Sequence, residues 1–271
     1  MQLGKVQVTM RRSQLSSVAQ LSDLIEHGEM SYAAQQIKPV TPRSGSERWF
    51  EWLVRPPLED HSLSTADFIN AVESLDLSLD LDTRIVKDAL GWLDMQPINT
   101  RLCINVSTAT LVNRHFSEFV VSTLQQSHLL PSQVCFDITL HESAGHFAGV
   151  SRFIRVVRQA GCVVALDMGM PGNALLGMLA PLGLVDYLKV DRAIVQAAPG
   201  SPVHREMLES LVDYGKRLNL PLVATGVDSE RHLELLTELE VEYYQGFLDG
   251  EPVIVAGQGF RDQFDHVERS A

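Results

Sequence analysis

Eight short apolar runs recur along this 271-residue chain, and most are separated by longer segments in which apolar residues have helical spacing. The predicted strands are residues 32–37, 49–54, 101–106, 134–138, 163–167, 187–190, 222–225 and 242–244. The predicted helices between them include residues 65–75, 82–93, 116–126, 149–159, 202–218 and 229–239. This alternation favours an α/β fold, and a closed (β/α)8 barrel rather than an open doubly wound sheet.

The first two apolar runs depart from the alternation. Only residues 38–48 join them, and this stretch contains Pro39, Pro42 and Gly45. A crossover between parallel strands needs about a dozen residues or more, so the short connection predicts a hairpin. The expected fold is therefore a modified TIM barrel with an antiparallel first strand.

Net charge, cysteine content and apolar run length indicate which partners and which cellular environment to expect. The net charge of −12 argues against a nucleic-acid polymer or an anionic membrane as partner, since both attract basic surfaces. The three cysteines, Cys103, Cys135 and Cys162, lie in or beside apolar runs and predict buried, reduced thiols in a cytoplasmic protein. No stretch approaches the roughly 18 apolar residues of a membrane span, so no membrane segment is expected in this chain.

The N-terminal region contains one further helical pattern. Residues 14–26 carry apolar side chains at helical spacing, and His27 and Gly28 end the pattern. Two interpretations stay open: a helix that packs on the flank of the domain, or a signalling helix that forms a homodimer. The predicted organisation is a tail and helix over 1–28, a barrel domain over 29–256 and a polar tail over 257–271.

Four polar residues stand at the ends of predicted strands, where the side chains of a barrel converge. Glu51, Asn105, Asp137 and Asp167 offer the hard oxygen ligands that divalent cations prefer. Taken singly, each is more typical of a turn cap than of a ligand. Four such residues on four successive strands indicate an ancestral metal site, although they do not establish that a metal still binds.

These four residues belong to a longer series of short motifs. The series comprises Glu51-Trp52-Leu53-Val54-Arg55, Ile104-Asn105-Val106-Ser107, Asp137-Ile138-Thr139, residues 163–172, Asp186-Tyr187-Leu188-Lys189-Val190-Asp191, Ala224-Thr225-Gly226-Val227-Asp228 and Tyr244-Gln245-Gly246. In this order, over about residues 30–254, the series resembles EAL domains, the phosphodiesterases of cyclic di-GMP. The resemblance implies a barrel whose first strand is antiparallel, which agrees with the predicted hairpin.

The resemblance also implies roles for the strand-end residues. Glu51 matches the Glu of the family signature, and Asn105 matches the metal-ligand Asn. Asp137 stands where the family usually has the longer Glu, and Asp167 matches the first Asp of an Asp-Asp-Phe-Gly turn. Lys189 matches the Lys that orders the attacking water.

Three positions lack the carboxylate that the resemblance leads one to expect. Met168 replaces the second Asp of the pair, Thr225 replaces a metal-site Glu, and Leu140 replaces the Glu that steadies the loop after the Asp pair. A thioether is a soft ligand and does not substitute for a carboxylate on Mg²⁺ or Mn²⁺. The resemblance therefore implies a degenerate site that requires no cofactor, in which one Mg or Mn ion could remain but not two.

Residues that resemble the nucleotide site of the family are retained. Gln35 matches a Gln of the first strand, Leu53 lies at the wall position, Arg55 matches the Arg that meets a ligand phosphate, and Gln245 matches the site Gln. The predicted ligand-binding set is completed by Asn105, Asp167 and Lys189. The alternative for Arg55 is a surface ion pair.

Several other residues allow two interpretations. Trp52 stands where the family has a small residue, and it either packs in the core or contacts a partner at the mouth of the site. Met168, Met170 and Leu140 either repack the core locally or form an apolar surface for a partner protein. The acidic run over residues 76–82 predicts a solvated connection between helices, and the alternative is an acidic docking face.

The expected function is that of a catalytically inactive EAL-domain signalling protein. It would act as a cyclic di-GMP receptor, as a regulator that binds a partner protein, or as both. The alternative is a weak Mg- or Mn-dependent phosphodiesterase that produces linear pGpG. The number of carboxylates at the strand ends discriminates between these functions.

Overall fold

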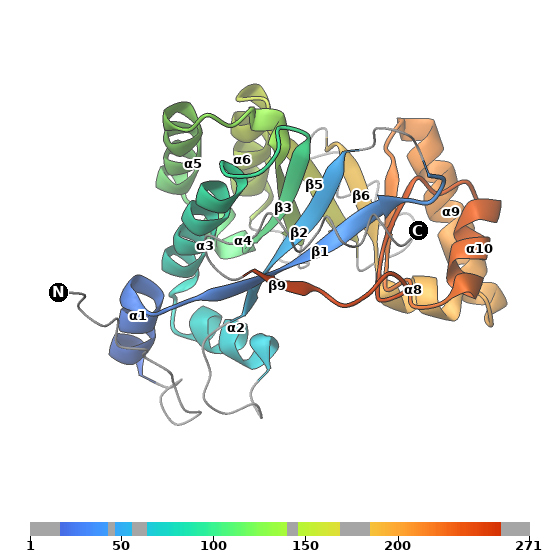
Figure 1. Ribbon diagram of the computed structural model, residues 1–271, viewed down its shortest axis with the longest axis horizontal. Helices are drawn as coiled ribbons and strands as arrows, with labels where there is room; N and C mark the ends of the chain where they lie inside the picture. The colour runs from blue at the N-terminus through green and yellow to red at the C-terminus, as the bar shows by residue number, and fades with distance from the viewer. Residues whose placement is uncertain (1–16, 43–46, 56–63, 140–145, 169–184, 256–271) are drawn as a thin grey trace.

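The chain forms a closed barrel surrounded by helices (Figure 1). The computed structural model describes residues 17–42, 47–55, 64–139, 146–168 and 185–255. The strands are β1 Ser31–Pro39, β2 Arg48–Arg55, β3 Thr100–Val106, β4 Val134–Thr139, β5 Val163–Met168, β6 Tyr187–Val190, β7 Leu222–Thr225, β8 Tyr243–Gln245 and β9 Val253–Val255. The eight predicted strands correspond to β1 to β8, while β9 was not predicted.

Strand order confirms the predicted fold class. Strands β2 to β8 follow one another in parallel, and β1 closes the barrel by pairing antiparallel with both β2 and β8. The hairpin predicted for the short connection is confirmed by a register that runs from Ser31 opposite Arg55 to Ile37 opposite Trp49. Strand β9 extends the sheet by pairing with β1.

Helices cover the outside of the barrel, with α3, α5 and α6 on one side of the view in Figure 1 and α8 to α10 on the other. Their bounds are α1 Val18–His27, α2 Thr65–Ser74, α3 Ser78–Leu93, α4 Thr108–Leu111, α5 Arg114–Gln126, α6 Phe147–Gln159, α8 Arg192–Ala197, α9 Pro202–Leu218 and α10 Glu230–Glu238. Local sequence explains several helix starts: the side chains of Ser64, Ser201 and Ser229 each accept a hydrogen bond from a backbone N–H of the first turn.

One prediction about the connection between α2 and α3 is wrong. Helix α3 begins at Ser78 rather than at residue 82, and Asp82 is buried rather than solvated. Helical spacing places Ser78, Leu81 and Asp82 on the face that packs inward. Asp76 and Asp80 are exposed, as predicted for the run.

The core has an inner and an outer part. One buried cluster contains Trp49, Cys103, Cys135 and Val223 from different barrel strands. A larger cluster joins the strands to the surrounding helices, and α1 contributes Leu21, Leu24 and Ile25 to it. The burial of all three cysteines as free thiols agrees with the sequence analysis.

Helix α1 packs against the barrel, as one of the two interpretations predicted. Arg84 of α3 donates hydrogen bonds to the carbonyl oxygens of Ile25, Glu26 and Gly28 at distances of 3.0, 3.2 and 3.3 Å. The predicted domain boundaries themselves stay a prediction. Within the described residues, no helix combines the length and the apolar character needed to cross a membrane.

Candidate functional site

Parallel strands bring the predicted site residues to one end of the barrel. Asn105 on β3 lies opposite Asp137 on β4, and Asp167 on β5 lies opposite Lys189 on β6. Strand β2 lies next to β3, and its Glu51 lies opposite Gln35 of β1 in the hairpin. Because parallel strands end at the same edge, residues far apart in sequence become neighbours there.

A buried ion cluster, formed by Glu51, Asp137 and Lys189, occupies the middle of this end. Lys189 Nζ lies 2.9 Å from Glu51 Oε2 and 2.5 Å from Asp137 Oδ2. Glu51 also accepts hydrogen bonds of 2.7 Å from Asn105 Nδ2 on Oε1 and from Gln245 Nε2 on Oε2. The structure therefore brings five of the predicted residues into direct contact.

Burial and neighbouring charges shift the pKa values of the ion cluster in different directions. Burial raises the pKa of Asp137 to about 7, against the opposing attraction of Lys189 and with repulsion from Glu51 and Asp167. Burial would also raise the pKa of Glu51, but Lys189 and hydrogen bonds from Asn105 and Gln245 hold it below its ordinary value. Burial alone would lower the pKa of Lys189, yet the two carboxylates raise it well above its usual range, so the ammonium stays charged.

The other predicted residues lie around the ion cluster. Gln245 Nε2 donates to Gln35 Oε1 at 3.0 Å, and Gln35 Nε2 donates to the Gly246 carbonyl at 3.4 Å. Asp167 accepts a long contact of 3.5 Å from Thr139 Oγ1, and burial raises its pKa. Thr225 Oγ1 donates to the Val190 carbonyl at 2.8 Å, so its hydroxyl joins the ends of β7 and β6 by a hydrogen bond. Leu140, Met170 and the side chain of Met168 lie outside the described residues.

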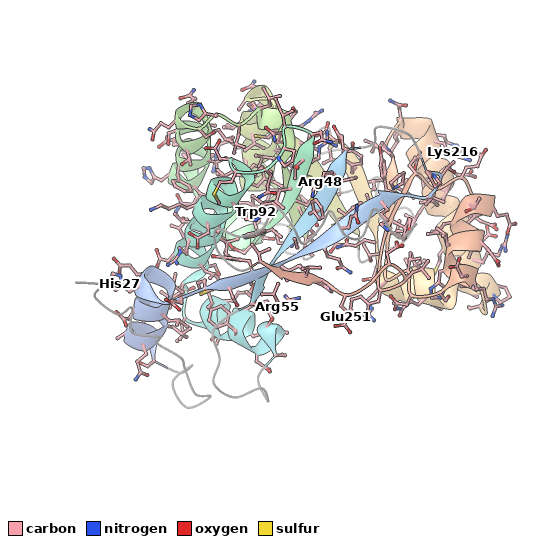
Figure 2. The ribbon with its side chains drawn as sticks, viewed as in Figure 1. His27, Arg48, Arg55, Trp92, Lys216 and Glu251 are labelled. Atoms are coloured by element: carbon pink, nitrogen blue, oxygen red, sulfur yellow. The ribbon has the colours of Figure 1, made fainter. Side chains whose placement is uncertain are left out.

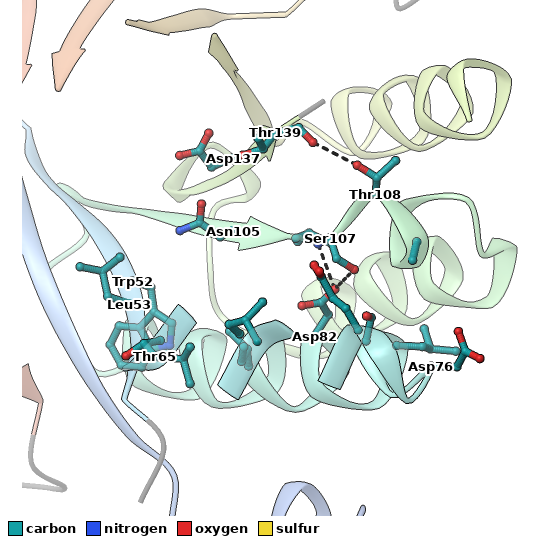
Figure 3. A pocket seen from close by; sticks show the side chains of 18 of the residues that line it. Trp52, Leu53, Thr65, Asp76, Asp82, Asn105, Ser107, Thr108, Asp137 and Thr139 are labelled. Carbon is teal, nitrogen blue, oxygen red and sulfur yellow. Dashed lines mark hydrogen bonds between the residues drawn. The ribbon is translucent and has the colours of Figure 1, made fainter. Parts of the chain in front are cut away.

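A pocket of about 690 Å³ opens beside the ion cluster. The ends of β2, β3 and β4 form one wall and helices α2 and α3 form another (Figure 3). Asn105 and Asp137 connect the pocket to the ion cluster, while Leu53 and Arg55 line it at the end of β2. Its volume is in the range of pockets that hold small molecules.

The guanidinium of Arg55 is available to this pocket. Arg55 ends β2 (Figure 2), and its Nη1 donates to the carbonyl oxygen of Val54 at 3.0 Å. Among the described residues it forms no ion pair, so the alternative of a surface ion pair finds no partner in that part of the chain.

Asp82 is a site residue that the sequence analysis missed. Its Oδ2 accepts hydrogen bonds from the backbone N–H of Ser107 at 3.0 Å and from Ser107 Oγ at 2.7 Å (Figure 3). Ser107 caps α4 two residues after Asn105, so Asp82 fixes the turn that follows a predicted ligand. The signal was the helical spacing of Asp82 with the apolar residues of α3.

Trp52 packs in the core, as one of its two interpretations predicted, and its burial leaves no exposed surface for a partner. The side chain is 2% exposed and stacks on Tyr32 with ring centroids 4.7 Å apart. Trp92 lies next to it, with a centroid distance of 5.2 Å. Residue 52 is on the outer face of β2, since the strand alternation turns its neighbour Glu51 to the interior.

The described residues do not fit a pair of divalent cations. Both oxygens of Glu51 and one oxygen of Asp137 already accept hydrogen bonds from nitrogen donors. Among the described residues, no group of three or more His, Cys, Asp or Glu side chains is placed to hold a metal ion. Two cations a few ångströms apart are held by several hard oxygen ligands, and the sequence lacks the carboxylates expected at Met168 and Thr225.

Comparison with known proteins relates this chain to one protein family and to several curated relatives. The family model for the EAL domain matches residues 18–252. The cyclic di-GMP phosphodiesterase RocR of Pseudomonas aeruginosa is 31% identical over 202 residues, covering 74% of this chain and 50% of RocR. The cyclic di-GMP phosphodiesterase PdeB of Shewanella oneidensis is 26% identical, covering 96% of this chain and 30% of PdeB. The chain spans about a third of the length of the first curated relatives that it matches.

Solved structures give the same fold. The FimX EAL domain from Pseudomonas aeruginosa bound to c-di-GMP superposes with a TM-score of 0.78 at 19% identity, covering 87% of this chain and 96% of that one. The PaMucR phosphodiesterase in complex with c-di-GMP has a TM-score of 0.75 at 23% identity, covering 89% and 97%. These likenesses show a shared fold, and the family match extends over most of the sequence. The chain therefore belongs to the EAL domain family.

Proposed function

We propose that this chain is a non-catalytic cyclic di-GMP receptor. The observation that carries the proposal is the guanidinium of Arg55, which lines a pocket of about 690 Å³ and lacks an acidic partner among the described residues. A planar guanidinium fork suits a phosphate group, with which it forms two charge-assisted hydrogen bonds. Relatives and structural neighbours that act on or bind cyclic di-GMP support the choice of ligand.

The remaining site residues would either contact the ligand or hold the neighbouring side chains in position. Leu53 supplies an apolar wall for the ligand, while Asn105 and Asp167 offer polar atoms near the pocket. Gln35, Gln245 and Lys189 fix the position of Glu51 through the hydrogen bonds at the barrel end. The absence of hydrolysis follows from Leu140, Met168 and Thr225, since none of these side chains supplies a charged metal ligand.

Titration calorimetry with cyclic di-GMP, in EDTA and in MgCl₂, tests the proposal. Wild type binds in both buffers with equal affinity, and Arg55→Ala weakens binding by at least about tenfold, since a lost charge-assisted pair costs roughly 1.5–3 kcal/mol. The matched control is Arg155→Ala, which removes an exposed arginine of α6 away from the pocket and leaves the affinity unchanged. No binding at high micromolar ligand in either buffer refutes the receptor.

Weak phosphodiesterase activity is a second candidate, because Glu51, Asn105, Asp137 and Lys189 still meet at the barrel end. Chromatographic detection of pGpG after incubation with Mn²⁺ or Mg²⁺ decides between the two. Product that disappears in Glu51→Gln identifies an enzyme, whereas intact substrate supports the receptor. A regulator that binds a partner protein stays a prediction.

A further inference from the structure

Strand β9 brings an exposed apolar side chain to the open end of the barrel, beside β1 (Figure 1). Ile254, the middle residue of β9, is 52% exposed, although its neighbours Val253 and Val255 pack against the larger core cluster. We propose that Ile254 extends the nucleotide site as a contact for a guanine base, so that the ligand reaches across β1 from Arg55 to β9. This inference rests on the cyclic di-GMP receptor proposed above.

The register of three strands places Ile254 on the same face as the pocket wall. Ala33 of β1 lies opposite Leu53 of β2 on one side and opposite Ile254 of β9 on the other, in two antiparallel pairs. Side chains of directly opposite residues point to the same face of a sheet, so Leu53, Ala33 and Ile254 form one row. Neighbouring strands are about 4.8 Å apart, and the row is therefore roughly 10 Å wide between its two larger side chains.

This row lies on the face that contains the polar residues of the site. Gln35 of β1 and Glu51 of β2 lie opposite each other two residues away, and both form hydrogen bonds with Gln245. Because strand residues alternate between two faces, the row points to the same side of the sheet as these site residues. Ile254 is therefore directed to the ligand side, where its exposed surface is available for contact.

Strand order explains why the ligand would reach β9. Arg55 ends β2, the pocket lies on the β3 side of β2, and β1 and β9 lie on its other side. Cyclic di-GMP carries two guanine bases joined through two ribose phosphates, so a molecule whose phosphate pairs with Arg55 has a base to either side. One base occupies the pocket, and the other lies over β1 and contacts Ile254. An aliphatic side chain suits the flat face of a base, because the contact removes apolar surface from water.

Replacing Ile254 tests this contact in two directions. Ile254→Ser removes apolar surface and should weaken cyclic di-GMP binding about fivefold in titration calorimetry, while the Tm of the free protein stays as in wild type because the side chain is exposed. Ile254→Trp offers a larger surface for stacking and should tighten binding by about the same factor. Its tryptophan emission should fall on saturation with ligand by more than that of wild type, whose three tryptophans are buried.

The matched control is Ile98, which is 73% exposed and precedes β3, at the end of the barrel away from the site. Ile98→Ser and Ile98→Trp should leave the affinity and the ligand-induced change in emission as in wild type. Equal affinities of wild type and Ile254→Ser overturn the inference while the receptor stands, and so does an Ile254→Trp protein whose emission changes no more than that of wild type. Wild type that binds no cyclic di-GMP refutes the receptor, and the base contact falls with it.

Discussion

At the scale of single residues, the protonation of Asp137 connects the site to stability. Its pKa of about 7 lies above the value of 3.8 for an exposed aspartate, so between about pH 4 and pH 7 the folded protein binds a proton that the unfolded chain releases. The free energy of unfolding should therefore fall as the pH rises through this window, by up to about 1.4 kcal/mol per pH unit. Below about pH 4.5 the lowered pKa of Glu51 acts in the opposite direction, because protonation then breaks its pair with Lys189.

Urea unfolding at pH 5, 6, 7 and 8 measures this slope, and Asp137→Asn should flatten it because the amide does not titrate. Asp213→Asn changes an exposed aspartate of α9 and should leave the slope as in wild type. A wild-type stability that rises from pH 5 to pH 7 would show that Asp137 is ionised throughout.

The site could be predicted from the sequence only where spacing along strands determines it. Glu51, Asn105 and Lys189 meet because strand ends in a barrel converge, and the sequence contains enough information to place them there. Hydrogen bonds between elements are harder to foresee. The contact of Asp82 with Ser107 depends on how α3 packs against β3. The local sequence around either residue does not predict the distance between them.

At the scale of secondary structure, Asp82 joins α3 to the turn after β3. Replacing it with alanine leaves the backbone N–H of Ser107 without its acceptor, and we expect a loss of about 2 kcal/mol in the free energy of unfolding. Burial raises the pKa of Asp82, so part of this cost is offset by removing a buried carboxyl group. Asp213→Ala, at an exposed helical position, should change stability by less than about 0.5 kcal/mol. Equal effects of the two substitutions in urea unfolding would contradict a structural role for Asp82.

Element type was predictable where the apolar periodicity is long, as in α9 and β3, and where a short connection forces a hairpin. Strand β9 was missed because its three residues, Val253 to Val255, are too few to show a period of two. The start of α3 was missed because residues 78–81, which belong to the acidic run, resemble a polar connection in sequence. Tertiary packing decides both cases, since β1 supplies the partner for β9 and α4 supplies the partner for Asp82.

At the scale of the whole molecule, the question is whether the barrel folds without α1. Leu21, Leu24 and Ile25 are at most 2% exposed and belong to the same core cluster as the helices around the barrel. Burying three such side chains contributes roughly 5–8 kcal/mol, which is comparable to the total stability of a domain. Residues 17–255 should therefore unfold in one cooperative transition, whereas residues 29–255 should be largely unfolded or aggregate. Circular dichroism during thermal unfolding compares the two, and equal Tm values would place the domain boundary after α1, because the helix would then add nothing to the core that it covers.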